Sequence, residues 1–78
     1  MAHVVMYSRR TCGLCDEARA AIESVRARVP FDFDEVAIDG DDGLEERFGL
    51  RVPVVEVDGV EAFEYQVPPG GLEPLVSG

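Results

Sequence analysis

The sequence has 78 residues, a length that suits one small domain, and residues 1–78 are predicted to form it. Its 16 acidic residues outnumber seven arginines, with no lysine, and the formal net charge of −9 argues against nucleic acid as a partner, because phosphate binding needs a basic surface. Only two cysteines are present, too close together for their disulfide to staple a fold, so a disulfide-stabilised scaffold is excluded.

The amino-terminal segment lacks the features of a secretory leader. Met1–Tyr7 has no basic start, no long apolar stretch and no small-residue cleavage pattern, and no other run approaches the length of a membrane span. We therefore expect a cytoplasmic protein with no membrane partner. In a reducing cytosol, a Cys-x-x-Cys pair beside a strand–helix–strand pattern is typical of catalytic redox chemistry or of metal binding.

The first predicted strand covers His3–Tyr7. This run is almost continuously apolar, which suits a central strand that is covered on both faces. His3 stands at the start of the strand, at the opposite end from Cys12. We interpret it as an ordinary surface histidine, because a metal site would need partner ligands that a single histidine lacks.

The two cysteines follow at a strand-to-helix junction. Thr11 is predicted to cap the helix, so that Cys12 lies at the helix N-terminus, where free backbone N–H groups and the helix dipole favour a thiolate. Cys15 lies on the same side of the helix and can attack a mixed disulfide formed on Cys12. The same two thiolates are alternatively half of a tetrahedral metal site, which a second copy or glutathione would complete.

An amphipathic helix is predicted from Leu14 to Val29. Its apolar residues recur at i, i+4, i+7, i+8, i+11 and i+15, and Pro30 disfavours helical geometry in the residue before it. On the polar side of this helix, Arg19 is spaced to pair with Glu23, and Glu23 with Arg26.

The middle of the chain is predicted to form a strand around Asp34–Ile38 and a short helix over Leu44–Phe48, which Gly49 stops. The loop between them, Asp39–Gly43, is rich in aspartate and in that respect resembles a calcium-binding loop. It lacks the alternating ligands and the closing glutamate of a calcium-binding loop, so Asp41 or Asp42 is expected simply to cap the short helix.

The clearest local signal is a β-hairpin. Asp58-Gly59 separates the alternating runs Val52–Val57 and Val60–Tyr65, and this dipeptide favours a two-residue turn. Pro68–Gly71 breaks the second strand, and Leu72–Val76 is predicted to make at most a turn or two of terminal helix. The residues of this helix that are expected to cover the sheet are Leu72, Leu75 and Val76.

Together these elements predict an α/β fold with one mixed four-stranded sheet, in the order β-α-β-α-β-β, and a shortened C-terminal helix. They resemble the glutaredoxin-like branch of the thioredoxin fold. Tyr7–Cys15 is similar to the glutaredoxin active-site segment, and Val52-Pro53 before a strand resembles its cis-proline loop. The resemblance in element order covers nearly the whole chain and is closest to short bacterial glutaredoxin-like proteins.

The resemblance implies roles for individual residues. Cys12 is the attacking thiolate, Cys15 is the resolving thiol, and Pro53 is a cis-proline that lies against the disulfide. The backbone N–H and C=O groups of Val52 are expected to pair with an extended thiol substrate. Arg9 matches a family lysine, and Arg9 and its neighbour Arg10 are expected to stabilise the thiolate or a substrate carboxylate.

Several residues depart from the glutaredoxin pattern. Gly13 and Leu14 replace the usual proline and tyrosine, and Arg51 replaces a threonine before Val-Pro. Ala62-Phe63-Glu64 stands where glutaredoxins carry Gly-Gly and an acid that binds glutathione. Glutathione and an external dithiol reductase are therefore both kept as candidate reductants.

The predicted function is a thiol–disulfide oxidoreductase that uses the Cys12–Cys15 dithiol. Its expected partners are protein or small-molecule disulfides and a thiol reductase, and it is expected to act as a monomer with no tightly bound cofactor and no resident metal. Two alternatives remain: a metal or iron–sulfur binding module that uses the same cysteines, and a redox-inactive binding domain.

Overall fold

The computed structural model describes residues 1–77, which form four strands and three helices. In chain order the elements are β1 (His3–Ser8), α1 (Gly13–Arg26), β2 (Asp32–Ala37), α2 (Asp42–Phe48), β3 (Val54–Val57), β4 (Val60–Glu64) and α3 (Pro69–Val76). This is the expected order of elements. Within the described residues, no helix is both long enough and apolar enough to cross a membrane.

The strands form one mixed sheet in the order β2-β1-β3-β4. β1 and β2 are parallel, and Ser8 pairs with Ala37; β3 is antiparallel to both β1 and β4. Val54 at the start of β3 pairs with Tyr7 of β1 and with Glu64 of β4. The segments that follow β1, β2 and β4, and the one that precedes β3, therefore all emerge at the same end of the sheet. We call this the Cys12 end.

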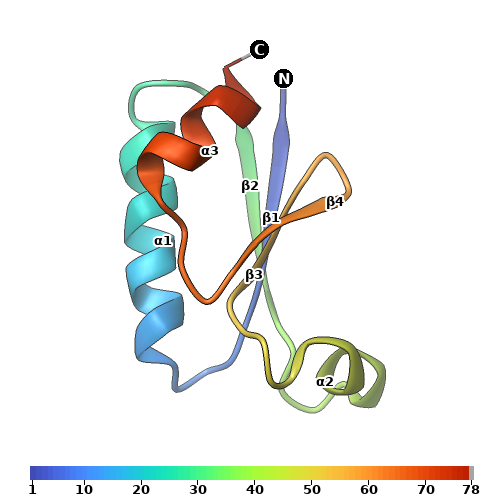
Figure 1. Cartoon of the computed structure of the whole chain (residues 1–78). Helices are drawn as coiled ribbons and strands as arrows, with labels where there is room; N and C mark the ends of the chain where they lie inside the picture. The colour runs from blue at the N-terminus through green and yellow to red at the C-terminus, as the bar shows by residue number, and fades with distance from the viewer. Residues whose placement is uncertain (78) are drawn as a thin grey trace.

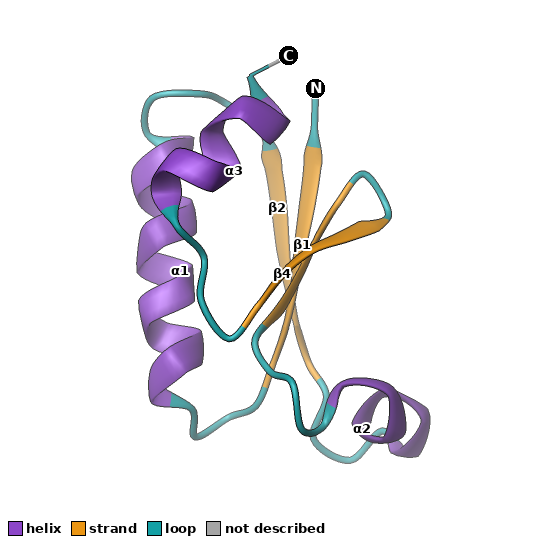
Figure 2. Ribbon diagram, in the orientation of Figure 1, coloured by secondary structure: helices purple, strands orange, loops and turns teal. Residues whose placement is uncertain are grey.

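Two helices, α1 and α3, lie together on one face of the sheet, and α2 lies near the Cys12 end, away from them (Figure 1). Figure 2 shows the two helices layered on that face of the strands, and residues of both layers form the main core. Its fully buried members include Val4 and Met6 from β1, Ile22 from α1 and Leu72 from α3. From Ala18 to Val25 the apolar stripe of α1 packs on the sheet as its spacing predicts. Leu14, the first residue of the predicted stripe, is instead 41% exposed, and Cys15 is buried in its place.

A second, smaller cluster attaches α2 to the sheet. It contains Phe48 of α2 with Ile38 and Val54, and the Tyr7 ring stacks on Phe48 with 4.3 Å between ring centroids. The prediction that β1 is covered on both faces is therefore only partly right. Val5 and Tyr7, on the second face, are half-buried, because the short helix α2 covers only one end of that face.

Both ends of the loop between α1 and β2 differ from the prediction. α1 ends at Arg26, and the N–H of Val29 reaches back to the carbonyl of Val25 across a terminal turn. Val29 lies outside the helix because the residue before a proline is disfavoured in the helical region. β2 covers Asp32–Ala37, beginning before the predicted strand, because its parallel pairing with β1 starts at His3.

The turn signals give the structure that the sequence predicts. Asp58 and Gly59 have φ values of 52° and 85°, as a two-residue hairpin turn of this type requires. Asp41 caps α2, and its Oδ1 accepts the N–H of Leu44 at 3.0 Å. One feature is unpredicted: the β3–β4 register shifts next to Val55, which leaves an extra residue in β4.

The terminal helix begins earlier than the sequence predicts. Pro69 starts α3, and the following glycines belong to the helix instead of a loop, because proline suits the first turn of a helix. Leu72 and Val76 are buried, four residues apart on one face. The prediction for Leu75 is wrong: this side chain is 48% exposed, because it falls off the face that Leu72 and Val76 share.

Candidate active site at the Cys12–Cys15 pair

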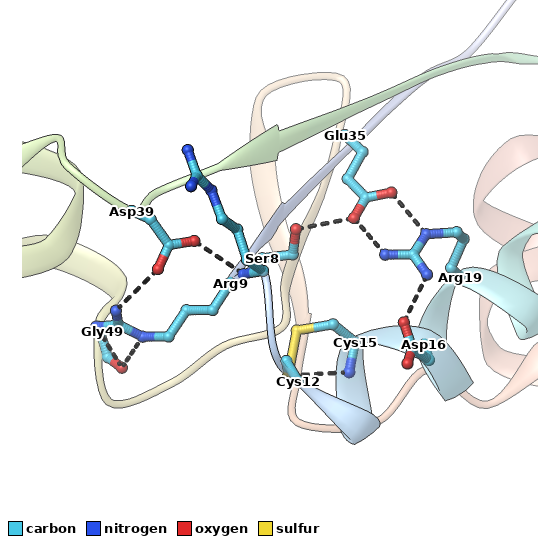
Figure 3. The surroundings of a disulfide bond; sticks show 10 residues. Ser8, Arg9, Cys12, Cys15, Asp16, Arg19, Glu35, Asp39 and Gly49 are labelled. Carbon is cyan, nitrogen blue, oxygen red and sulfur yellow. Dashed lines mark hydrogen bonds and ion pairs between the residues drawn. A yellow bond between two sulfur atoms is a disulfide. The ribbon is translucent and has the colours of Figure 1, made fainter.

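Cys12 and Cys15 are joined by a disulfide at the start of α1 (Figure 3). Cys12 is the N-cap residue, and its Sγ accepts a hydrogen bond from the backbone N–H of Cys15 at 3.1 Å. The prediction that Thr11 caps the helix is wrong. Because α1 begins at Gly13, the side chain that faces the free N–H groups is the sulfur of Cys12.

The two cysteines differ in their access to solvent. Cys12 is half-buried, whereas Cys15 is completely buried on the face of α1 that also carries Ala18 and Ile22. A disulfide that approaches from solution therefore meets Cys12 first. Cys15 shares a helix face with Ala18 and Ile22, and the packing of that face against the core buries it.

An acidic side chain holds the loop that leads into the helix. The Asp39 carboxylate accepts the backbone N–H of Arg10 at 2.8 Å, and the N–H of Ile38 donates to the carbonyl of Ser8 at 2.8 Å. The segments after β1 and β2 are thus tied together at the Cys12 end. The acidic loop that begins at Asp39 therefore also positions the segment before Cys12, a role that the sequence does not indicate.

A polar network links this segment to α1 (Figure 3). The buried Ser8 hydroxyl donates to Glu35 at 2.8 Å, and Arg19 donates to Glu35 at 2.6 Å and to Asp16 at 2.8 Å. The predicted Arg19–Glu23 pair is wrong, because β2 places Glu35 where the Arg19 guanidinium can contact both of its oxygens. Glu23 instead pairs with Arg26, as predicted.

The same network shifts the titration of Glu35. The hydrogen bonds from Arg19, assisted by the one from Ser8, hold the pKa of Glu35 below its usual value, although partial burial opposes them. Glu35 therefore remains a carboxylate at neutral pH. Sequence analysis missed this residue because it lies 27 positions from Ser8 and 16 from Arg19. The only sequence signal for the network is the i,i+3 spacing of Asp16 and Arg19.

Arg9 and Arg10, the two predicted cationic site residues, are placed differently. The Arg9 guanidinium turns toward α2, where it donates to the Gly49 carbonyl at 3.3 Å and to Glu45 at 3.3 Å. It also lies 3.6 Å from Asp39. Gly49 permits this approach, since a Cβ there would come within 2.9 Å of Arg9 Nη2. Arg10 is exposed, two residues before Cys12 in the chain.

Val52 and Pro53 precede β3 at the Cys12 end. Their peptide bond is cis. Pro53 is buried, and its carbonyl accepts the N–H of Tyr65 at 2.9 Å, whereas Val52 is half-buried against the smaller core cluster. Within residues 1–77, no backbone hydrogen bond uses the N–H or C=O of Val52. These two groups therefore have unused capacity for a ligand backbone.

Comparison with known proteins identifies a family. The sequence matches the family model described as Glutaredoxin-like domain (DUF836) over residues 3–75. A structural-genomics target protein from X. campestris is 35% identical, with a TM-score of 0.78 and coverage of 91% of each chain. A protein from Nitrosomonas europaea is 26% identical, with a TM-score of 0.84 and coverage of 97% of this chain and 92% of that chain.

A mutant thioredoxin from Halobacterium salinarum is similar in fold, with a TM-score of 0.65 at 20% identity, over 96% of this chain and 71% of that chain. No curated protein matches the sequence. The structural matches confirm the expected α/β, thioredoxin-like fold. The disulfide between Cys12 and Cys15 fits redox chemistry on that fold.

Proposed function

The chain belongs to the Glutaredoxin-like domain (DUF836) family, and from this membership we propose that it is a thiol–disulfide oxidoreductase whose dithiol is Cys12 and Cys15. The observation that carries the proposal is the unequal exposure of two cysteines that share a disulfide. Cys12 is half-buried at the N-cap of α1, and Cys15 is fully buried. An accessible nucleophile beside a protected resolving thiol suits a two-step disulfide exchange.

In the first step, the Cys12 thiolate attacks one sulfur of a substrate disulfide. A Cys12–substrate S–S bond forms, the substrate S–S bond breaks, and the other half leaves as a thiolate that takes a proton from water. The backbone N–H of Cys15 and the N-terminus of α1 favour negative charge on the Cys12 sulfur, since this sulfur already accepts that N–H.

In the second step, the Cys15 thiol loses its proton and attacks Cys12 Sγ. The Cys12–Cys15 disulfide forms, the mixed disulfide breaks, and the remaining substrate half leaves as a thiol after it gains a proton. Two electrons pass from the dithiol to the substrate. The unused N–H and C=O of Val52 are suited to hold an extended substrate backbone during these steps, and the exposed Arg10 is suited to attract its carboxylates.

The oxidised protein must then be reduced by an external thiol. We propose a dithiol reductase in preference to glutathione. Ala62-Phe63-Glu64 stands where glutaredoxins carry Gly-Gly and a glutathione-binding acid, and Glu64 is already paired with Arg51 at 3.2 Å. Such a cycle suits a reducing compartment such as the cytoplasm. The substrates are protein or small-molecule disulfides.

Two serine variants test the mechanism. Cys12→Ser is expected to lower the reduction of 2-hydroxyethyl disulfide to the uncatalysed rate, because the accessible nucleophile is gone. Cys15→Ser is expected to accumulate a mixed disulfide on Cys12, which mass spectrometry of the intact protein detects. Equal activity in wild type and Cys12→Ser would contradict the proposal.

A separate measurement addresses the metal-binding alternative. Within residues 1–77, no group of three or more His, Cys, Asp or Glu side chains is arranged to hold a metal ion, so a cluster would need ligands from a second copy or from glutathione. Anaerobic reconstitution with iron and sulfide, followed by absorption spectroscopy and size-exclusion chromatography, tests this. A visible chromophore in a metal-dependent dimer would favour that alternative over the oxidoreductase.

A further inference from the structure

Three large apolar side chains are exposed at the Cys12 end of the sheet. Leu14, between the two cysteines, is 41% exposed; Leu50, in the segment before β3, is 94% exposed; and Tyr65, directly after β4, is 45% exposed. The strand registers bring these three segments to the same end of the sheet. Exposed apolar side chains at the end of the sheet that carries a reactive group indicate a surface that meets another molecule.

Tyr65 is held in a fixed position. Its backbone N–H donates to the carbonyl of Pro53 at 2.9 Å, and its hydroxyl donates to the carbonyl of Leu50 at 3.0 Å. Its φ of 68° is uncommon for a bulky residue and persists only where the surroundings impose it. The ring therefore forms a fixed wall beside the segment that contains Val52 and Pro53.

A groove of about 310 Å³ lies between this wall and the start of α1. Leu14, Glu17 and Ala18 line one side, and residues 65–68 line the other. Leu14 lies between the two cysteines in the chain, so the groove begins at a neighbour of the disulfide, although neither cysteine lines it. Its size is near the lower limit of small-molecule sites and suits one amino-acid side chain with its adjoining backbone.

The groove carries a negative charge. Of its lining residues, all within the described part of the chain, Glu17 alone is charged. The Glu17 side chain is exposed and takes part in no ion pair among residues 1–77. Arg19, the arginine nearest to Glu17 in the sequence, is paired with Asp16 and Glu35.

We propose that this groove selects the substrate: it accepts the polypeptide beside a protein's disulfide-bonded cysteine, with an apolar side chain between Leu14 and Tyr65 and a lysine or arginine against Glu17. The inference rests on the proposed oxidoreductase function and makes Glu17 a specificity-determining residue. The net charge of −9 attracts the same cationic partners during encounter. Glutathione disulfide, which offers neither a large apolar side chain nor a lysine or arginine, is disfavoured.

The test compares two peptide disulfides that differ at one residue in each peptide. Each is the homodisulfide of a short peptide with a single cysteine flanked by leucine and by either lysine or glutamate. We expect the reduced wild-type protein to reduce the lysine peptide about five- to tenfold faster in kcat/KM, since an exposed charge contact is worth a few-fold and the glutamate peptide adds repulsion. We expect Glu17→Lys to reverse this preference.

Glu46→Lys is the matched control. Glu46 is exposed on α2, takes no part in the groove, and its replacement changes the net charge by the same amount. We expect this variant to keep the wild-type preference. If both variants weaken the preference for the lysine peptide equally, that preference arises from the net charge of the protein and not from the groove, and the inference is overturned. Equal rates for the two peptides in the wild type would also overturn the inference.

A small neutral substrate separates failure of the inference from failure of the function. If wild type reduces 2-hydroxyethyl disulfide but does not distinguish the peptides, the oxidoreductase function stands and the specificity inference falls. If it reduces neither kind of disulfide, the proposed function fails and the inference falls with it. Circular dichroism of each variant verifies that the replacement has not unfolded the protein.

Discussion

The N-termini of α1 and α2 have the same geometry but different capping chemistry. In each, the N-cap residue is extended, and its side chain accepts the backbone N–H three residues later: Cys12 Sγ from Cys15 at 3.1 Å, and Asp41 Oδ1 from Leu44 at 3.0 Å. The carboxylate undergoes no covalent change and only stabilises its helix. The sulfur alternates between thiolate and disulfide in the proposed cycle.

The comparison shows how a stabilising position becomes a reactive one. Free N–H groups and the helix dipole favour an anion at either terminus. At α2 the capping group is the Asp41 carboxylate, and its effect is to stabilise the helix. At α1 the anion is a sulfur that can attack, and burial of Cys15 one turn later supplies the resolving thiol. Exchanging or removing the caps therefore tests which role each terminus has.

The largest effect is expected from Cys12→Asp, which gives α1 the cap of α2. Disulfide reduction should fall to the uncatalysed rate, because the carboxylate cannot form a mixed disulfide. The free energy of unfolding should stay within about 1 kcal/mol of the reduced wild type, or rise, because aspartate is a preferred N-cap. Turnover of 2-hydroxyethyl disulfide and urea denaturation measure the two quantities. Substantial remaining turnover would show that Cys12 is not the nucleophile.

A smaller effect is expected at the other terminus. Asp41→Ala removes the cap of α2 and should lower the free energy of unfolding by about 1 kcal/mol, which corresponds to a Tm decrease of roughly 4–8 °C in a domain of this size. Thermal unfolding monitored by circular dichroism measures it. Asp42→Ala is the control, because Asp42 is in the first turn but is not the cap. Equal losses in the two variants would contradict the cap assignment.

The smallest effect concerns the ion pair that ties α1 to the sheet. Arg19 lowers the pKa of Glu35. The carboxylate therefore stabilises the folded state at pH values above its unfolded pKa of about 4.3. This contribution is lost as the pH falls through the lowered pKa of the folded state. Glu35→Gln should therefore be less stable than wild type at pH 7, by less than about 1 kcal/mol because the pair is partly exposed.

The difference between Glu35→Gln and wild type should shrink steadily from about pH 5 to pH 3. Urea denaturation of both proteins across this range measures it. A difference that stays constant over the range would mean that Glu35 stabilises the protein through packing and not through its charge.

Local signals predicted much of this molecule correctly. Asp58-Gly59 forms its two-residue turn, Asp41 caps α2, and the cysteines lie at the start of α1, because each feature depends on interactions within a few residues. Some errors were local, such as the Thr11 cap, which lies one residue from the true N-cap. Another arose where a distant segment competes. Arg19 pairs with Glu35 of β2 instead of Glu23, since the sheet offers a carboxylate that contacts both arms of its guanidinium.

The sequence by itself determined the chemistry and its spacing: two thiols three residues apart, at the junction of a strand and an amphipathic helix. It also determined the order of the elements. Only the tertiary structure decided that Cys15 is sealed from solvent, that Arg9 turns toward α2, and that Tyr65 forms a groove with Leu14. The physical reason is that local patterns set conformation, whereas strand register and packing decide which distant side chains meet.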